Sequence, residues 1–353
     1  MNTSKQTLKA TTLSSNPSEI YYDALGKTRL ISFQHDFVHK SLPKHFLQKC
    51  EARRFLVFDE SLPKYMIDPI YSKLEIHGAL AIPAGEKAKS WLNLKNILDA
   101  AAEINLDRSS QIIALGGGAI GDVVGLAASL YMRGISWINV PTSSLAQADS
   151  SIGGKTAINS DYGKNMIGTF HPADITIMDA SLLSSLPKRD LRSGIAEVVK
   201  HAILGDIELF EWLEKTSTRL LDSSENLKYA LRRSCEIKLE IIGDDWQDKS
   251  GARQRLNLGH TFAHALEKLV DDQKLLNHGE AVAIGLCMAA DMSLNLGYCS
   301  SQFRKRIYTL LQDLGFATDP RPFINNREAK FEQLLANDKK NTNGTKNFVY
   351  INS

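Results

Sequence analysis

The sequence has few cysteines, no long apolar run and no excess of charge of either sign. The four cysteines are scattered and form no Cys-x-x-Cys pair, so we expect reduced thiols rather than a disulfide framework. No stretch approaches the ~18 apolar residues of a membrane span, and residues 1–17 lack the apolar core of a secretory signal. The 42 basic and 40 acidic residues give +2, which offers nucleic acid or a membrane surface no general attraction. These absences predict a cytoplasmic protein, in which any small anionic ligand needs a local basic cluster.

The 353 residues, 43% of them apolar, are enough for about two domains with sizeable cores. In the first half we expect strands at 54–59, 79–83, 111–115 and 137–140, and helices at 62–77, 91–104 and 119–131. This alternation is typical of a parallel sheet with helices on both faces. From 189 to about 314 the apolar residues recur at helical spacing. We therefore predict a flexible leader over 1–20, an α/β domain over 21–185 and an all-α domain over 186–353.

Three histidines and a glutamate have spacings found in metal sites. His260 and His264 are four residues apart and share a helix face, and His278 follows fourteen residues later. Upstream, Glu197 and Lys200 are three residues apart and also share a face. Catalytic zinc typically takes three ligands of the His/Glu kind and keeps one position open. Core and capping histidines have the same spacing, so both interpretations stay open here, and the absence of HExxH disfavours a metalloprotease.

A glycine turn joins an expected strand to an expected helix in the run 116–122, Gly-Gly-Gly-Ala-Ile-Gly-Asp. Its backbone amides can approach a pyrophosphate closely at the positive end of the helix. The spacing departs from GxGxxG, and an ordinary tight turn is the alternative. A dinucleotide site is favoured by Asp59, which ends an earlier strand where it can bind a ribose hydroxyl, and by the charged run 85–90.

A third cluster is basic and polar, and it lies in a stretch that we expect to be rich in loops. It contains Arg133, the run 149–156 (Asp-Ser-Ser-Ile-Gly-Gly-Lys-Thr) and the run 163–165 (Gly-Lys-Asn). An isolated lysine usually lies on a solvated surface. Cations placed between glycines, Ser and Asn indicate an anion cradle instead, because the glycines bare their amides and the cations supply charge. A Walker A loop is excluded because position 149 is not glycine.

Six motifs follow one another along the chain: Gly116-Gly-Gly-x-x-Gly-Asp122, Asp149-Ser-Ser-x-Gly-Gly-Lys-Thr, Gly163-Lys-Asn-x-Ile-Gly, Ala196-Glu-Val-x-Lys200, Asn257-Leu-Gly-His-Thr-Phe-x-His264 and His278-Gly-Glu-Ala-Val. In order and spacing they resemble the 3-dehydroquinate synthases of the sugar-phosphate cyclase family, over roughly 55–340. The resemblance is specific because six separate motifs fall in register. It implies a Rossmann-like, NAD-binding α/β domain, a helical domain and an active site in the interdomain cleft of each subunit of a homodimer.

Carried over position by position, the resemblance implies a metal site of Glu197, His260 and His278. His264 then handles protons nearby, which replaces the first idea that both members of the His260/His264 pair bind metal. The implied catalytic residues are Lys155, Lys200, His264, Asp149, Asn165 and Arg133. The implied substrate-binding residues are Lys238, Arg253, Asn257, Lys164 and one of Lys339 and Lys340, of which we favour Lys339. The implied NAD-binding residues are Asp59, Glu86, Lys89, Gly117, Gly118, Asp122, Thr142 and Ser143.

The resemblance also implies a reaction of the shikimate pathway, catalysed by a phosphate-eliminating carbon–oxygen lyase. In the family, 3-deoxy-D-arabino-heptulosonate 7-phosphate is oxidised by NAD, loses phosphate, is reduced again and closes to 3-dehydroquinate by an intramolecular aldol step. Zn²⁺ or Co²⁺ holds the hydroxyl that is oxidised. Lys155, Lys200 and Arg133 would supply charge to the leaving phosphate, and Arg253 or Lys238 would hold the carboxylate. The expected partners are this small sugar phosphate and a second copy of the chain, with no nucleic acid and no membrane.

Three alternatives stay open. A sibling cyclase would form an amino-dehydroquinate, a valiolone or a deoxyinosose, although Lys238, Arg253, Asn257 and His264 together favour a substrate with a carboxylate. A metal-dependent dehydrogenase of the glycerol type would release NADH and no phosphate. A binding or scaffold protein derived from such an enzyme is the non-enzymatic alternative, which intact metal ligands disfavour.

Overall fold

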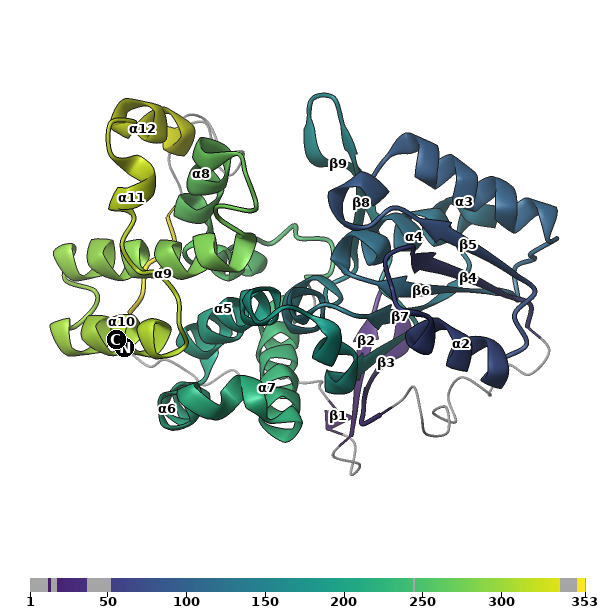
Figure 1. The fold of residues 1–353 in the computed structure, drawn as a ribbon, viewed down its shortest axis with the longest axis horizontal. Coiled ribbons are helices and arrows are strands. Elements are labelled where there is room, and N and C mark those ends of the chain that lie inside the picture. Colours follow the sequence, from purple (N-terminus) through teal and green to yellow (C-terminus); the bar gives the residue numbers. More distant parts are fainter. Residues whose placement is uncertain (1–11, 14–17, 37–51, 244, 337–347, 353) are drawn as a thin grey trace. The chain divides into compact units, whose positions relative to one another are not determined.

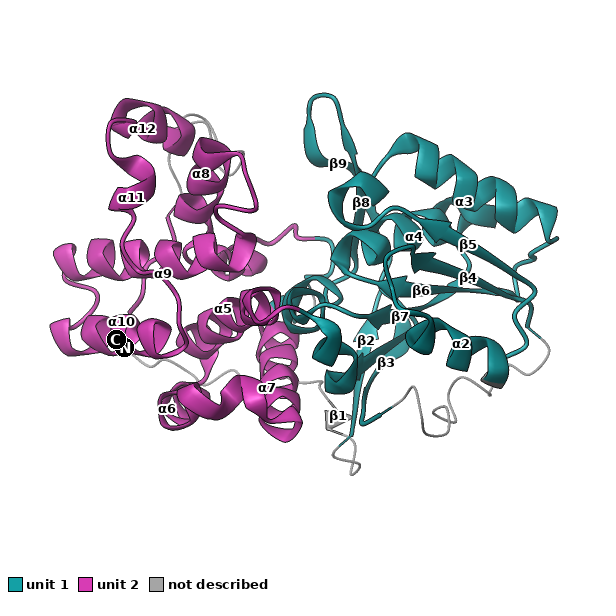
Figure 2. Ribbon diagram, viewed as in Figure 1, with its two compact units in different colours: residues 1–186, 242–247 teal, residues 187–241, 248–353 magenta. Residues whose placement is uncertain are grey.

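The computed structural model describes residues 12–13, 18–36, 52–243, 245–336 and 348–352. They form two compact units, one from residues 1–186 with 242–247 and the other from 187–241 with 248–353 (Figure 2). Within the described residues, no helix is both long and apolar enough to cross a membrane. Figure 1 labels the elements of both units, and each unit is considered by itself.

The first unit is built on an eight-stranded sheet. In spatial order its strands are β1 (Thr12–Leu13), β2 (Glu19–Ala24), β3 (Lys27–Gln34), β10 (Ile175–Asp179), β7 (Ser136–Pro141), β6 (Gln111–Gly116), β4 (Arg54–Asp59) and β5 (Gly78–Ile82). The pairs β1–β2 and β2–β3 are antiparallel, and every other pair in this sheet is parallel. The predicted parallel sheet is therefore confirmed, and the expected strands at 54–59, 79–83, 111–115 and 137–140 correspond to β4, β5, β6 and β7.

Helices cover both faces of this sheet, as the strand–helix alternation predicted. They include α2 (Lys64–Lys73), α3 (Trp91–Glu103) and α4 (Gly118–Leu130). Alternate side chains of a strand point to opposite faces. On β4, Phe55 joins a core that contains residues of α3 and α4, whereas Leu56 joins a second core with Met66 of α2. Both faces of the strand are buried, which is why it reads as a continuous apolar run.

Strands also occur where the sequence led us to expect loop or leader. A hairpin of β8 (Lys155–Ser160) and β9 (Gly163–Phe170) occupies the stretch that we expected to be loops. That expectation was wrong because β9 is largely exposed, so it has no apolar pattern to reveal it. Within the expected leader 1–20, Leu13 pairs with Ile20, whose side chain is fully buried. Residues 12–13 and 19–20 of that segment are therefore strand.

The second unit consists of helices, so the predicted helical second half is confirmed. They are α5 (Lys188–Gly205), α6 (Ile207–Thr216), α7 (Ser224–Ile242), α8 (His260–Val270), α9 (His278–Asn295), α10 (Ser301–Asp313), α11 (Arg321–Ile324) and α12 (Glu328–Ala336), with 3₁₀ segments η5 (Ser217–Asp222) and η6 (Ala252–Asn257). The long α9 is apolar almost all round and packs against α5, α8 and α10 (Figure 1). Such a helix belongs in a core. Beyond α7, Trp246 stacks on Tyr22 of β2, so residues 242–247 belong with the first unit.

The order of the parallel strands places a ligand site in the first unit. From β4 the chain crosses to β5 on one side, and then returns to β6 on the other side of β4. Open α/β sheets bind ligands at such a switch point, beyond the carboxyl ends of the strands. Asp59 ends β4 and Gly116 ends β6, so this edge carries both the acidic residue and the glycine turn found in the sequence.

Candidate active site

The glycine turn lies at the carboxyl end of β6 and begins α4. No side chain caps the first turn of this helix, so its amides are available to a ligand. A methyl group on Gly118 would lie 2.5 Å from Oγ of Ser150, so a larger residue there would displace this hydroxyl. The amide of Thr142 donates to the Gly116 carbonyl at 2.9 Å, and Oγ of Ser143 is the nearest side-chain atom to Gly117. The structure thus brings Thr142 and Ser143 beside the turn.

A chain of polar contacts connects the segment after β5 with the hairpin and α4. Nζ of the buried Lys89 lies 2.5 Å from Oδ2 of Asp122 and also donates to Oδ1 of Asn165. The amide of Asn165 donates to Oδ1 of Asn159 at 3.0 Å, and Nδ2 of Asn159 donates to Glu86 at 2.6 Å. The structure therefore brings Glu86, Lys89, Asp122 and Asn165 together. Asn159 is the link that sequence reasoning missed, because a single Asn between motifs has no distinguishing pattern.

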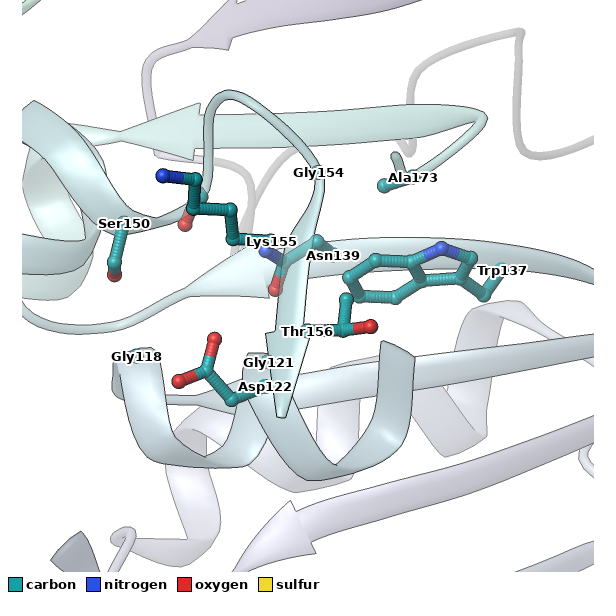
Figure 3. A pocket seen from close by; sticks show the side chains of 11 residues that line it. Gly118, Gly121, Asp122, Trp137, Asn139, Ser150, Gly154, Lys155, Thr156 and Ala173 are labelled. Atoms are coloured by element: carbon teal, nitrogen blue, oxygen red, sulfur yellow. The ribbon is translucent and has the colours of Figure 1, made fainter. Parts of the chain in front are cut away.

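A small pocket lies between the glycine turn and the start of β8. Its lining includes Gly118, Asp122, Ser150, Gly154 and Lys155. Figure 3 shows the Lys155 side chain extending to the same side of the pocket as Ser150, while the Asp122 carboxylate points into it from α4. Oγ of Ser150 is buried without a hydrogen-bond partner among the described residues. This unsatisfied hydroxyl, the lysine and the uncapped helix end are the groups that an anion requires.

The backbone before Lys155 also has the conformation of an anion-binding turn. Gly153 and Gly154 both have positive φ angles, 106° and 67°. A side chain on Gly154 would lie 2.5 Å from Pro172, so the turn needs glycine for space as well as conformation. Asp149 and Ser150 lie just upstream in the short π-helical segment η3 (Ala146–Ser150). The sequence prediction of a glycine-rich cradle with a lysine therefore has a matching backbone.

In the second unit, Glu197, His260 and His278 converge. Glu197 is fully buried on α5, and His260 and His278 are the first residues of α8 and α9. Nε2 of each histidine lies 3.3 Å from Oε1 of Glu197, and the three potential ligand atoms lie within 4.8 Å of one another. His264 adjoins this set, with its ring centroid 5.5 Å from that of His260. The geometry matches the ligand set that the resemblance implied.

Hydrogen bonds on the far side of each ring set the tautomers. Nδ1 of His260 lies 3.1 Å from the carbonyl of Leu258, and Nδ1 of His278 lies 3.2 Å from Oε1 of Glu267. Because both partners are acceptors, Nδ1 can donate its proton to them while Nε2 binds a metal ion. Two imidazoles and one carboxylate, with an open position remaining, suit Zn²⁺ or Co²⁺.

The buried carboxylate of Glu197 also holds Lys200, one turn further along α5. Oε1 faces the two histidines, and Oε2 forms an ion pair with Nζ of Lys200, which is 2% exposed. Burial opposes ionisation, but Lys200 and His260 outweigh it and keep the pKa of Glu197 well below its usual range. The carboxylate is therefore ionised, and Lys200 lies beside the candidate ligand set.

The two histidines respond differently to their surroundings. Burial lowers the pKa of His260, so this ring is neutral at pH 7. Burial acts in the same direction on His278, but hydrogen bonds to Glu197 and Glu267 outweigh it and raise its pKa to about 10. In the metal-free protein His278 thus carries a proton that a metal ion has to displace.

We expect zinc binding at pH 8 to release about one proton. Because the pKa of His278 is raised to about 10, zinc affinity should rise about tenfold per pH unit up to that value and level off above it. Titration calorimetry in two buffers of different ionisation enthalpy measures the proton count. An apparent enthalpy that is independent of the buffer, together with affinity that does not change between pH 7 and 9, would contradict this assignment.

Two glycines bring the first residues of α8 and α9 close together. Gly259, with a φ of 76°, precedes His260, and Gly285 lies opposite it on α9. A methyl group on Gly285 would lie 2.2 Å from the carbonyl oxygen of Gly259, which is backbone and cannot move aside cheaply. The close approach of α8 to α9, and with it the position of His260, depends on this contact.

Gly285→Ala should therefore destabilise the protein by roughly 1–3 kcal/mol, the usual cost of overpacking, and weaken zinc binding. Thermal unfolding of the metal-free variant and a zinc competition titration measure the two effects. Gly205→Ala is a suitable control, because its methyl group would meet a single atom of the Ile237 side chain at 3.0 Å. Equal effects of the two substitutions would show that the α8–α9 contact has no special role.

The remaining predicted substrate residues of the second unit lie near the metal ligands in sequence, and two are buried. Arg253 and Asn257 belong to η6, which packs against α5 and leads into α8. Arg253 is 4% exposed, and Lys238 on α7 is 5% exposed. Buried cations of this kind need a counter-charge or a ligand. Lys339 and Lys340 lie outside the described residues.

Other predicted residues of the first unit are spread more widely. Asp59 stands at the switch point and accepts hydrogen bonds from the amide and hydroxyl of Ser61, at 2.9 and 2.6 Å. Lys164 is exposed on β9. Arg133 is in η2 (Tyr131–Arg133), directly after the end of α4. Since α4 has 13 residues and rises about 1.5 Å per residue, Arg133 is about 20 Å from the glycine turn and does not line its pocket.

Glu267 is a residue that we did not predict for this site. It contacts His278 from α8, and the sequence contained a signal for it, because His260, His264 and Glu267 are spaced i, i+4 and i+7 on one helix. We passed over it because an acidic residue on a helix face is usually a solvated one.

The fold and the two clusters define a class of protein. A parallel sheet with an uncapped glycine turn at its switch point suits a dinucleotide, and a two-histidine, one-carboxylate cluster suits a catalytic metal ion. Family models described as 3-dehydroquinate synthase N-terminal and C-terminal match residues 79–193 and 194–341. The 3-dehydroquinate synthase of Cereibacter sphaeroides is 41% identical over 301 residues, which are 83% of this chain and 81% of the relative. The chain belongs to the 3-dehydroquinate synthase family.

Solved structures of sibling cyclases share the fold. The 2-epi-5-epi-valiolone synthase of Streptomyces hygroscopicus, with NAD⁺ and Zn²⁺ bound, is 27% identical with a TM-score of 0.80, covering 92% of this chain and 91% of that one. A 2-deoxy-scyllo-inosose synthase with carbaglucose-6-phosphate, NAD⁺ and Co²⁺ is 25% identical with a TM-score of 0.77, covering 89% and 85%. The predicted cofactors, NAD and Zn²⁺ or Co²⁺, are the ones that these two structures hold.

Proposed function

We propose that this enzyme converts 3-deoxy-D-arabino-heptulosonate 7-phosphate to 3-dehydroquinate and phosphate, as a phosphate-eliminating carbon–oxygen lyase. The observation that supports this most directly is the arrangement around Glu197, whose two oxygens face the histidine pair and Lys200. This arrangement places the ammonium group of Lys200 beside a metal site whose open position suits a substrate hydroxyl. Oxidation needs the metal and NAD, and elimination of phosphate also needs the cations.

When bound, Zn²⁺ or Co²⁺ at Glu197, His260 and His278 would act as a Lewis acid on the substrate hydroxyl, and NAD at the glycine turn would accept the hydride and later return it. The protein residues prepare both sites. The series of hydrogen bonds that connects Glu86 with Asp122 holds the hairpin against the start of α4. The Gly116–Gly118 turn offers its amides to the pyrophosphate.

The side chains also supply charge and proton transfer for the elimination. We assign Lys155, with the Gly153 and Gly154 turn, to the phosphate, because this backbone and this ammonium group form the anion cradle of the first unit. Lys200 stabilises the anionic character that develops next to the metal site. His264 adjoins His260 and lies outside the ligand set, so it is placed to carry a proton.

The choice between 3-dehydroquinate synthase and a sibling cyclase depends on the substrate carboxylate. Identity to the curated 3-dehydroquinate synthase is 41%, against 27% and 25% for the two sibling enzymes of known structure. We propose that the buried Arg253 pairs with the carboxylate, because its planar guanidinium can make two parallel hydrogen bonds. A sugar phosphate without a carboxylate could not make this pair of hydrogen bonds.

Arg253→Lys should raise KM for the seven-carbon keto-acid phosphate about 10- to 150-fold. This corresponds to about 1.5–3 kcal/mol, the range for a hydrogen bond to a charged group. Arg255→Lys is the matched control, since Arg255 is exposed in the same 3₁₀ segment and donates to the Leu204 carbonyl. Steady-state kinetics measure both, and an unchanged KM in Arg253→Lys would contradict the assignment.

The function itself is tested by incubating the protein with 3-deoxy-D-arabino-heptulosonate 7-phosphate, NAD and Zn²⁺. We expect release of inorganic phosphate and a product with the mass of 3-dehydroquinate. A seven-carbon sugar phosphate without a carboxylate is the comparison substrate, and we expect it to turn over poorly. Preference for that comparison substrate would favour a sibling cyclase instead.

We further propose that the enzyme is a cytoplasmic homodimer with no nucleic acid or membrane partner. The family resemblance and the nearly balanced charge, +2 overall, support this. Light scattering after size-exclusion chromatography tests the dimer. The domain boundaries at 20 and 185 and the interdomain cleft stay predictions.

A further inference from the structure

We propose that Glu267 is a positioning residue for the metal site, because it fixes the tautomer and the orientation of His278. The proposal rests on the proposed function only for the use of the metal, and it can be tested on metal binding alone. Oε1 of Glu267, on α8, lies 3.2 Å from Nδ1 of His278. Nε2 of the same ring lies 3.3 Å from Oε1 of Glu197, on α5. The imidazole of α9 is thus held between carboxylates from two other helices.

Only one orientation of the ring places each of its nitrogens beside a carboxylate. A rotation of 180° about the bond to the ring would remove both nitrogens from their carboxylates. With Glu267 accepting the proton of Nδ1, Nε2 is the nitrogen that can bind a metal ion once its own proton is displaced, and it faces the same Glu197 oxygen as Nε2 of His260. Without Glu267 the ring is free to rotate or to change tautomer, and a fraction of the molecules lose the third ligand.

His260 does not need such a side chain. Its Nδ1 lies 3.1 Å from the carbonyl of Leu258, two residues earlier in the same turn. The backbone therefore sets the tautomer of His260, whereas a side chain from another helix sets that of His278. This difference makes Glu267 the outer partner of a ligand histidine that mutation can remove.

The backbone of His278 is anchored independently of Glu267. Asn277 and Glu280 form a capping box at the start of α9, and Arg189 makes two hydrogen bonds to Glu280, at 2.7 and 2.6 Å. The amide of Gly279 donates to Ser193 at 3.0 Å. Glu267 itself is 27% exposed, so its removal leaves no core cavity. We therefore expect a Glu267 variant to release the ring while the helix stays in place.

Two substitutions separate the hydrogen bond from the charge. Glu267→Ala removes both, and zinc affinity should fall about 10- to 100-fold, the usual effect of losing an outer partner of a metal-bound histidine. Glu267→Gln keeps an acceptor oxygen, so it should recover most of this loss. Glu332→Ala is the control, because Glu332 is an exposed acidic residue on the neighbouring α12 and its loss should not change zinc binding.

The experiment is a zinc competition titration on substrate-free protein, together with the visible absorption spectrum of the cobalt-loaded forms. We expect weaker zinc binding and an altered cobalt spectrum for Glu267→Ala, near-normal values for Glu267→Gln, and similar unfolding of the metal-free proteins. Unchanged zinc affinity and cobalt spectrum in Glu267→Ala would overturn the proposal. If that variant does not fold, ¹⁵N NMR of Glu267→Gln decides: an unprotonated Nδ1 on the metal-loaded His278 overturns it, and a protonated one supports it.

These outcomes are separate from those of the proposed function. A wild-type protein that binds zinc in a Glu267-dependent way but releases no phosphate contradicts the function and supports the positioning role. A wild-type protein that releases phosphate and shows the same zinc affinity without Glu267 supports the function and contradicts the positioning role.

Discussion

Replacement of His278 by alanine is expected to abolish both zinc retention and turnover. The site has two imidazoles and one carboxylate, and all three atoms lie within 4.8 Å of one another. A site of three ligands loses its geometry when one imidazole is removed, because the remaining Glu197 and His260 cannot enclose the ion. Metal analysis after gel filtration and a phosphate-release assay measure the two losses. Chelator-treated wild type should likewise be inactive, and should recover with Zn²⁺ or Co²⁺.

The control for this prediction is His35→Ala, which removes an exposed histidine of the first unit and should leave both properties unchanged. Full activity of the metal-free wild-type protein would remove the basis of the whole assignment. Zinc retained by His278→Ala at wild-type affinity would show that the ligand set is wrong.

Lys200→Met is expected to lower the rate of phosphate release by about 100- to 1,000-fold, which is the range for losing one preorganised group that stabilises an anion. Methionine keeps most of the volume of this buried side chain while removing its charge. NAD affinity should be nearly unchanged, because Lys200 belongs to the second unit and the glycine turn to the first. Kinetics of phosphate release and calorimetric titration with NAD measure the two quantities.

Lys188→Ala is the matched control, because Lys188 is on the same helix, is 82% exposed and pairs only loosely with Asp222, at 3.4 Å. A wild-type rate of phosphate release in Lys200→Met would show that the lysine only balances the charge of Glu197. An equal loss of NAD affinity would show that we have divided the substrate and cofactor residues wrongly.

Much of the fold could be predicted because its main strands are buried on both faces. In β4 and β6 every position but one, Phe58, is buried, so each strand reads as a short apolar run that ends in Asp or Gly. The hairpin of β8 and β9 could not be predicted in this way, since hydrogen bonds across the pair hold β9 while Lys164, Asn165 and Met166 remain exposed. The burial of Ile20, Tyr22 and Ala24 on β2 follows an alternating pattern that we overlooked.

The sequence likewise predicted only part of the candidate site. Helical spacing identified His260 and His264, but spacing within one helix cannot show which side chains of other helices meet them. Glu197 and His278 come from α5 and α9; the sequence marked both as candidate ligands, and the family resemblance chose them in place of His264. Helical spacing places Glu267 on the face of His260 and His264, but its contact with His278, like the contacts of Asn159, depends on the packing of separate elements.

We expect NAD to be reduced and reoxidised within each turnover. This expectation is tested most directly by supplying Zn²⁺, excess 3-deoxy-D-arabino-heptulosonate 7-phosphate and only one NAD per enzyme subunit, and by following phosphate release together with the absorbance of NADH. We predict many equivalents of phosphate per NAD, a product with the mass of 3-dehydroquinate and no accumulation of NADH. Phosphate release that stops after one equivalent per NAD would show that NAD is not regenerated within the turnover. NADH that accumulates without phosphate release would show a dehydrogenase instead.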